Sequence, residues 1–274
     1  MSRFGFIGFG SMAKMLIGGL IRFAGVAGTD IIVTRKSSDK FTEINEIFPD
    51  VQLAKTPADV VKNAEYVFIC TKPMDVKAVL LEIKQNVGSG THVVVLAGTV
   101  KLDDIESVMA CKVSKLIPTV TSEIGEGISL VCHGTSVTQK DKKSLHQYIA
   151  CLGGIKEVDD QDIGFAAELT SCMPGFIASI FDNMAKAAAL HTQTFDYEAI
   201  SEILTYTVLA TAKMLQERDL TYREVVERVA TKGGITQEGV AVFEEMLPPV
   251  FEAMFSRTLQ KRALMEQRIT EANR

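Results

Sequence analysis

The sequence predicts an α/β protein in which an N-terminal domain built on a doubly wound sheet precedes a C-terminal domain made of helices alone. Three observations carry this prediction. Short β-branched runs alternate with helical patterns in the first half of the chain, a glycine turn follows the first run, and no convincing strand pattern occurs from Gln161 onward. Strands that alternate with helices are typical of a doubly wound sheet. We therefore expect one domain over residues 1–158 and a second over residues 159–274.

Six apolar runs are expected to form the sheet. They lack the alternation of half-exposed strands, so both faces of the sheet should be covered. The runs cover residues 3–7, 30–34, 66–70, 92–96, 113–117 and 128–132. Helical patterns follow the glycine turn to about residue 23 and then cover residues 40–47, 57–62, 75–85, 102–109 and 139–151.

The second half of the chain contains helical patterns alone. A long apolar helix is predicted over 163–190, with a break or kink at Met173-Pro174-Gly175 because proline removes a backbone donor. Further helices are expected over 197–217, 220–229, 236–246 and 249–269. A helix that is apolar nearly all round must be buried on all sides. We therefore expect a homodimer formed through the C-terminal helices, with a higher assembly of dimers as an alternative.

Composition and charge exclude several classes of protein. The 274 residues include 29 Lys and Arg against 34 Asp and Glu, and the resulting net charge of −5 lacks the basic footprint of a nucleic-acid-binding protein. Lys14 and Arg22 interrupt the apolar N-terminal stretch, which excludes a signal peptide or membrane span there. Five cysteines without a CxxC pair indicate reduced thiols. We expect a cytoplasmic protein that binds neither nucleic acid nor membrane.

The histidines give no metal prediction. The chain has four of them, His92, His133, His146 and His191. None is followed or preceded by a cysteine or carboxylate at ligand spacing, so the sequence predicts no metal site.

The glycine turn has the form G-x-G-x-x-A and carries the cofactor prediction. Its residues are Gly8, Phe9, Gly10, Ser11, Met12 and Ala13. The turn follows a strand and opens a helix, which is the context that a dinucleotide-binding fingerprint requires. The first glycine permits the tight turn, the second lets the backbone approach a pyrophosphate, and the small third residue allows close helix packing. The alternative is an incidental glycine turn.

The end of the second strand favours NADP(H) as the cofactor. An NAD-binding protein usually has Asp or Glu there to bind the ribose 2′-hydroxyl. This chain has Thr34, Arg35, Lys36 and Ser37 instead. A guanidinium binds a phosphate through a fork of donors, so Arg35 is the main expected contact to a 2′-phosphate. The alternative is a solvated basic loop.

Two later strand ends should face the same crevice, because ligands bind at the carboxyl ends of the strands. Thr71, Lys72 and Pro73 follow the third strong run, and Ala97 and Gly98 follow the fourth. We expect these five residues on the nicotinamide side of the cofactor.

Four motifs together resemble the pyrroline-5-carboxylate reductase family. They are Gly8 to Ala13, Lys72-Pro73, Ala97-Gly98 and Gly233-Gly234-Ile235-Thr236, in the order and approximate spacing of that family. The resemblance runs from about residue 3 to residue 255. It implies a Rossmann-type N-terminal domain, an all-helical dimerisation domain with interlocking helices, and the reduction of a cyclic imine to proline with NAD(P)H.

The turn at Gly233-Gly234 is the candidate substrate site. Two glycines before a helix expose backbone N–H groups that suit a carboxylate, and Thr236 adds a hydroxyl that could hydrogen-bond an imine nitrogen. We therefore expect Thr236 to be catalytic, with Thr231, Lys232, Gly233 and Gly234 binding the substrate. The family resemblance implies that Met173 also lies on the substrate side. The alternative is an ordinary glycine-rich turn between helices, with Thr236 as an N-terminal helix residue.

Three segments depart from the family pattern. Lys115 to Thr119 replaces Arg-x-Met-Pro-Asn, with the proline retained, and Thr170 to Phe176 replaces Ser-Gly-Ser-Gly-Pro-Ala-Tyr. Cys172, Met173 and Phe176 fall in the second segment, and Lys232 stands where proline is usual. This pattern resembles the late-competence reductase-like branch of the family. Two alternatives to a pyrroline-5-carboxylate reductase stay open: a reductase of a different small imine or keto acid, and a catalytically weak NADPH-binding regulatory protein.

Overall fold

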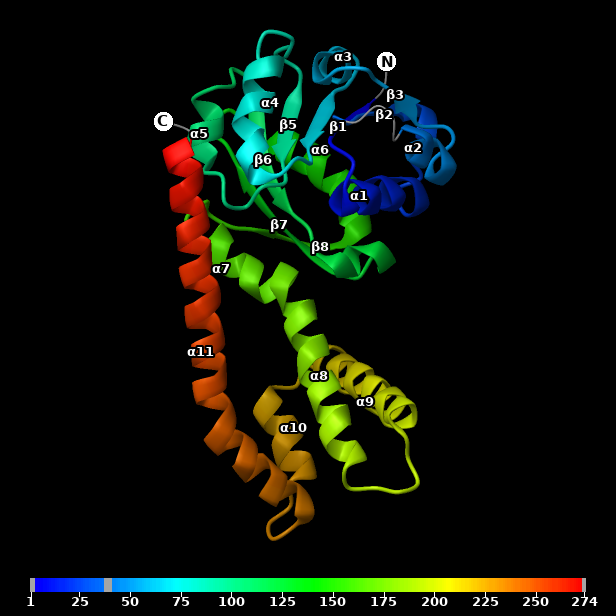
Figure 1. Cartoon of the computed structure of the whole chain (residues 1–274), viewed down its shortest axis with the longest axis vertical. Helices are drawn as coiled ribbons and strands as arrows, with labels where there is room; N and C mark the ends of the chain where they lie inside the picture. Colours follow the sequence, from blue (N-terminus) through cyan, green and yellow to red (C-terminus); the bar gives the residue numbers. More distant parts are fainter. Residues whose placement is uncertain (1–2, 37–40, 273–274) are drawn as a thin grey trace. The chain divides into compact units, whose positions relative to one another are not determined.

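The computed structural model describes residues 3–36 and 41–272 (Figure 1). The chain forms two compact units. Met1–Met173 together with Leu259–Arg274 make up the first, here called the sheet unit, and Pro174–Thr258 make up the second, here called the helical unit. The sequence-based division between residues 158 and 159 concerns functional domains and stays a prediction.

The sheet unit contains an eight-stranded sheet with the order β3-β2-β1-β4-β5-β6-β7-β8. The strands are β1 Phe4–Ile7, β2 Ile31–Thr34, β3 Gln52–Leu53, β4 Tyr66–Ile69, β5 His92–Val95, β6 Lys112–Ile117, β7 Gly127–His133 and β8 Gly153–Glu157. Neighbouring strands are parallel except β6 and β7, which pair antiparallel. All six predicted strands are present. β3 and β8 were not predicted, because β3 has two residues and β8 begins with Gly153-Gly154 and exposes alternate side chains.

Helices cover both faces of this sheet (Figure 1). They are α1 Ser11–Arg22, α2 Phe41–Ile47, α3 Pro57–Lys62, α4 Val76–Ile83, α5 Leu102–Glu106, α6 Gln139–Ile149 and α7 Ile163–Ala167. Successive strand residues point to opposite faces. Phe68 packs in one buried core with residues of α1 and α6, and its neighbour Val67 packs in the other with residues of α3, α4 and α5. The predicted doubly wound sheet is confirmed.

The long apolar helix, for which a break or a kink was predicted at Met173-Pro174-Gly175, keeps helical backbone through these residues. α7 passes into a π-helical segment, Glu168–Cys172, and then into α8, Met173–Ala189. The ring of Pro174 would clash with the carbonyl of Thr170 in a regular α-helix. A π-helical segment, which is wider than an α-helix, lies directly before this proline, and such segments are places where helices kink.

The helical unit contains most of α8, then α9 Tyr197–Glu217, α10 Tyr222–Val229 and the first part of α11. α11 runs over Ile235–Ala272 as one helix, whereas two helices separated at Pro248-Pro249 were predicted. Prolines at these positions leave the carbonyls of Glu244 and Glu245 without their helical donors. Both residues are exposed, so water can satisfy these carbonyls and the helix continues.

The stretch Ile163–Ala189 is long and apolar enough to cross a membrane by length and composition alone. The same stretch forms part of the helices that were expected to meet a second subunit. The helical unit also exposes large apolar side chains, including Ile203, Leu209, Val242, Phe243 and Met246.

Candidate active site

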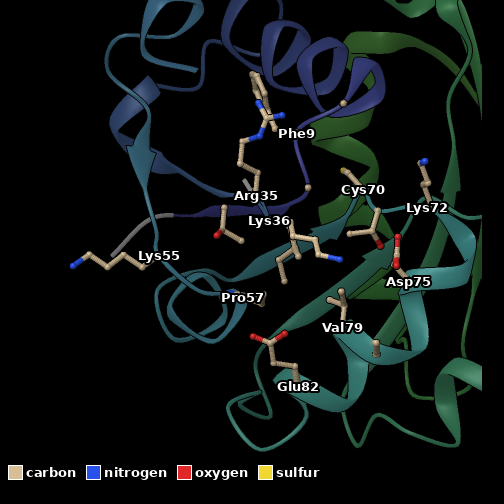
Figure 2. A pocket seen from close by; sticks show the side chains of 16 residues that line it. Phe9, Arg35, Lys36, Lys55, Pro57, Cys70, Lys72, Asp75, Val79 and Glu82 are labelled. Atoms are coloured by element: carbon tan, nitrogen blue, oxygen red, sulfur yellow. The ribbon is translucent and has the colours of Figure 1, made fainter. Parts of the chain in front are cut away.

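A cavity of about 510 Å³ opens at the carboxyl ends of β1, β2 and β4 (Figure 2). The strand order reverses between β1 and β4, and such a switch point is where doubly wound sheets bind ligands. Eight predicted cofactor-binding residues line the cavity: Gly8, Phe9, Gly10, Thr34, Arg35, Lys36, Thr71 and Lys72. Other lining residues were not predicted, namely Lys55, Pro57, Asp75, Val79 and Glu82, because they come from α3, α4 and the segments before these helices.

The glycine turn leaves the amino end of α1 open toward this cavity. Gly8 has φ +99°, and a Cβ there would lie 2.8 Å from the carbonyl oxygen of Cys70, so the turn requires glycine. A Cβ on Gly10 would meet nothing within 4 Å. The first backbone hydrogen bond of α1 runs from the N–H of Lys14 to the carbonyl of Gly10 at 3.0 Å. The N–H groups of residues 11–13 therefore remain for a ligand.

Arg35 lies at the end of β2, and its guanidinium is already paired. Its Nη1 donates to Oε2 of Glu43 on α2 at 2.9 Å, and Lys14 pairs with the other oxygen of the same carboxylate. The hydrogen bond from Lys14, and then that from Arg35, lowers the pKa of Glu43, which keeps it ionised. The guanidinium carbon also lies 6.0 Å from the centre of the Phe9 ring. A 2′-phosphate would have to share Arg35 with Glu43.

The neighbouring basic residues differ in direction. In Figure 2 the side chain of Lys36 extends toward the centre of the cavity, and that of Lys55 extends away from it. Both residues are exposed. Ser37, the remaining predicted contact to the 2′-phosphate, lies outside the described residues.

Three threonine hydroxyls follow three adjacent parallel strands. Thr71 comes after β4, Thr99 after β5 and Thr119 after β6, and each Oγ1 is buried without a hydrogen-bond partner among the described residues. Buried hydroxyls are nearly always hydrogen-bonded. A polar ligand at the carboxyl edge of the sheet could form the hydrogen bonds that these three hydroxyls lack. Only Thr71 was predicted, because Thr99 and Thr119 are ordinary residues in sequence.

The loop after β5 is held by a buried ion pair. Lys115 Nζ on β6 lies 2.6 Å from Oδ1 of Asp160 and donates to the carbonyl of Gly98 at 3.1 Å. The predicted residue Gly98, with Lys115, Asp160 and Arg262, lines a second cavity of about 610 Å³ in the sheet unit. Ala97 is buried beside Gly98, and Pro73 begins a short 3₁₀ turn before α4.

The candidate substrate residues lie mainly in the helical unit. Gly233 has φ +73°, and its N–H donates to Oε1 of Gln237 at 2.7 Å. The N–H of Gly234 donates to the carbonyl of Thr231 at 2.9 Å. Lys232 and Thr236 are exposed, and Thr236 is the second residue of α11. The turn thus has the predicted form, but both glycine N–H groups have partners within it.

Met173 belongs to the sheet unit and is half-buried at the start of α8. Two residues earlier, Ser171 Oγ donates to the carbonyl of Pro118 at 2.9 Å. This bond joins two of the segments that depart from the family pattern, at residues that lie within the sheet unit.

Comparisons with known proteins agree with this geometry. Residues 3–99 match a model described as NADP oxidoreductase coenzyme F420-dependent, and residues 160–265 match one described as pyrroline-5-carboxylate reductase dimerisation. The chain is 32% identical to pyrroline-5-carboxylate reductase 3 of Bacillus subtilis, covering 98% of both chains, and 24% identical to ComE operon protein 4 of the same organism, covering 94% of both. A pyrroline carboxylate reductase structure from Plasmodium falciparum, with NADP bound, has a TM-score of 0.83 over 98% of both chains at 17% identity.

These matches, together with the fold, show an NAD(P)-dependent oxidoreductase that acts on a C=N bond. At 32% identity over nearly its whole length, the chain belongs to the pyrroline-5-carboxylate reductase family. The predicted family, fold class and NADP(H) cofactor are confirmed, and the match to a dimerisation domain supports the predicted homodimer. Membership of the late-competence branch stays a prediction. The chain is more similar to pyrroline-5-carboxylate reductase 3, at 32% identity, than to ComE operon protein 4, at 24%.

Proposed function

We propose that the protein reduces the C=N bond of pyrroline-5-carboxylate with NADPH to give proline. The observation that carries this proposal is the cavity at the carboxyl ends of β1, β2 and β4, which has the open end of α1 and a paired arginine on its rim. The 32% identity to a protein named pyrroline-5-carboxylate reductase supports the choice of substrate.

The residues of the cavity divide into three contact groups in this proposal. Gly8, Phe9 and Gly10 shape the turn, and the N–H groups of Ser11, Met12 and Ala13 bind the pyrophosphate. Thr34, Arg35, Lys36 and Ser37 bind the 2′-phosphate. Thr71, Lys72, Pro73, Ala97 and Gly98 face the nicotinamide. The open space beside Gly10 and the unpartnered hydroxyl of Thr71 fit such a ligand.

The chain orients the substrate and supplies hydrogen bonds. NADPH would supply a hydride to the imine carbon, and water would supply the proton that the imine nitrogen takes up. Thr236 donates a hydrogen bond to that nitrogen, and the turn at Gly233-Gly234 binds the substrate carboxylate. The side chain of Gln237 has to release the N–H of Gly233 for this contact. Thr231, Lys232 and Met173 complete the substrate side. Most of the rate then comes from orientation.

We also propose a cytoplasmic homodimer formed through the helical unit. The apolar stretch Ile163–Ala189 lies entirely within the match to a dimerisation domain, and a second subunit would cover the exposed apolar side chains of α9 and α11. Light scattering should give twice the mass of one chain, and a monomer would contradict the proposal.

A second candidate function is the reduction of a different small imine or keto acid. The observation that favours it is the exposed cation of Lys232 beside a glycine turn whose N–H groups are already partnered. Where a carboxylate would bind, this chain has an added positive charge at Lys232, and both glycine N–H groups already have acceptors.

One experiment separates these functions. Purified protein is mixed with NADPH and either pyrroline-5-carboxylate or an open-chain keto acid with ammonia, and the nicotinamide absorbance is followed. Saturable oxidation with pyrroline-5-carboxylate and formation of proline support the first function. Oxidation of NADPH with the keto acid and ammonia, but not with pyrroline-5-carboxylate, supports the second function. NADPH binding without turnover on either substrate would overturn both and support the regulatory alternative.

A further inference from the structure

Three metal-ligand side chains that lie far apart in the sequence meet in the sheet unit. His133 ends β7, His146 lies on α6 and Glu157 ends β8. Nε2 of His133 lies 3.1 Å from Nε2 of His146, and one ligand atom from each of the three side chains lies within 4.8 Å of the others. The imidazoles are half-buried and the carboxylate is exposed, so an ion can reach them from solvent.

Ser114 fixes the orientation of the His133 ring. Its Oγ lies 2.7 Å from Nδ1 of His133 and 2.7 Å from Nε2 of the buried His92. A hydroxyl has one proton, so it donates to one ring and accepts from the other. When it accepts from His133 and donates to His92, Nε2 of His133 keeps a lone pair for a metal. Metal-binding histidines usually donate their second N–H in this way.

The spacing of the two imidazoles already suits a shared ion. Two nitrogens at about 2.05 Å from a tetrahedral ion are about 3.3 Å apart, which is close to the observed 3.1 Å. Without an ion, one proton lies between the two Nε2 atoms. An ion would replace this proton, and His146 would carry its own proton on Nδ1.

The charge around the cluster also suits a cation. Burial lowers the pKa of His133 to about 4 and also lowers the pKa of His146, so both rings are neutral near pH 7. The hydrogen bond from Lys142 lowers the pKa of Glu157, which is therefore ionised. Lys142 pairs with one oxygen of Glu157 and would have to share the carboxylate with the ion.

We propose that His133, His146 and Glu157 bind one divalent transition-metal ion of the zinc class. Two imidazole nitrogens and one carboxylate oxygen are a common ligand set for Zn²⁺, and water would fill the remaining position. None of the three residues lines the cavity at β1, β2 and β4, so this site does not depend on the proposed reductase function.

The ion would link β7, α6 and β8 at one edge of the sheet. β8 is the edge strand and pairs with β7, and α6 precedes β8 in the chain. A ligand that binds the folded state alone raises stability by mass action. Zn²⁺ should therefore raise the melting temperature of the protein, and the rise should saturate at one ion per chain.

The test uses full-length, tag-free protein treated with a chelator and then titrated with Zn²⁺ by calorimetry. Co²⁺ serves as a second probe, because its visible absorption reports ligand number and geometry. We expect one equivalent to bind, and His146→Gln and Glu157→Gln to weaken binding at least about 10-fold. Neither variant alters a side chain that is hydrogen-bonded directly to Ser114, so both should fold.

Two control variants locate the site. His191→Gln removes an exposed histidine of the helical unit, and Cys172→Ser removes a half-buried thiol, which is a zinc ligand by chemistry. Both should bind Zn²⁺ like the unaltered protein. The proposal is overturned if no stoichiometric ion binds, if His146→Gln binds as tightly as the unaltered protein, or if Cys172→Ser causes the loss.

Discussion

The ammonium of Lys115 lies 2.6 Å from Oδ1 of Asp160, and the second oxygen of the same carboxylate accepts the N–H of Leu102 at 2.9 Å. Lys115 also donates to the carbonyl of Gly98. One buried side chain thus joins β6, the loop after β5 and the segment before α7. The lysine that departs from the family arginine holds the loop on which the nicotinamide is proposed to rest.

Asp160→Asn should destabilise the sheet unit. The Lys115 side chain is 1% exposed, and removing the charge of its partner leaves a buried ammonium with no opposite charge beside it. Breaking a buried pair in this way costs about 3 kcal/mol. Urea unfolding measures the change, with Asp159→Asn as the control because Asp159 is exposed. If the two variants unfold at the same urea concentration, the pair does not hold the loop.

Arg35→Ala should weaken NADPH far more than NADH. The guanidinium would make charge-assisted hydrogen bonds to the 2′-phosphate that NADH lacks, and their loss costs about 1.5–3 kcal/mol, or roughly 10- to 150-fold in affinity. Fluorescence titration with each nucleotide measures the ratio. Lys55→Ala is the matched control, since this side chain extends away from the cavity (Figure 2). Equal losses for both nucleotides would mean that Arg35 does not read the phosphate.

Glu43→Gln should have the opposite effect on NADPH. The carboxylate occupies Arg35 and would repel a phosphate, so its removal frees a donor and a positive charge. We expect the dissociation constant for NADPH to fall by about 3-fold or more, with little change for NADH. The same titration checks this outcome. Weaker NADPH binding in the variant would show instead that Glu43 positions Arg35 for the phosphate.

Asp141→Asn should change how stability depends on pH. The hydrogen bond from Lys112, and then that from Thr138, lowers the pKa of Asp141 to about 2. A lowered pKa stabilises the folded state above the unfolded value near 4, and this contribution is lost as the pH falls toward 2. The variant should be less stable at pH 6 by about 1–2 kcal/mol, and the difference should shrink between pH 4 and pH 2.

Urea unfolding at several pH values tests this expectation. Thr56 caps α3 and donates its hydroxyl to Asp59 at 2.7 Å, as Thr138 caps α6 and donates its hydroxyl to Asp141 at 2.6 Å, so Asp59→Asn controls for the loss of this shared contact. A pH-independent difference between Asp141→Asn and the unaltered protein would contradict the account.

The elements that local pattern determines were predictable from sequence. Six strands were predicted from the β-branched runs, because their apolar side chains pack into the buried cores on both faces of the sheet. β8 was missed because its glycines and exposed side chains carry no such pattern. The double proline in α11 led to the wrong prediction of two helices. The helix continues because the exposed carbonyls that lose their backbone donors can bind water.

In the candidate site too, features set by local sequence were predictable, and features that depend on tertiary packing were not. The turn at Gly8 and Gly10 was predictable because its motif is complete within six residues, Gly8 to Ala13. The pairing of Arg35 with Glu43 was not, because it depends on where α2 packs. Lys115 and Asp160 are 45 residues apart, and the His133 and His146 contact joins a strand to a helix. Such contacts depend on the fold and leave no spacing signal.

The most direct test of the proposed reaction follows the hydrogen atom itself. The protein is incubated with pyrroline-5-carboxylate and NADPH deuterated at the transferable position, and the product is analysed by mass spectrometry. Proline with one deuterium on the former imine carbon is the predicted result, and Thr236→Val should lower its rate of formation with NADPH binding unchanged. Absence of labelled proline from protein that binds NADPH would contradict the proposed function.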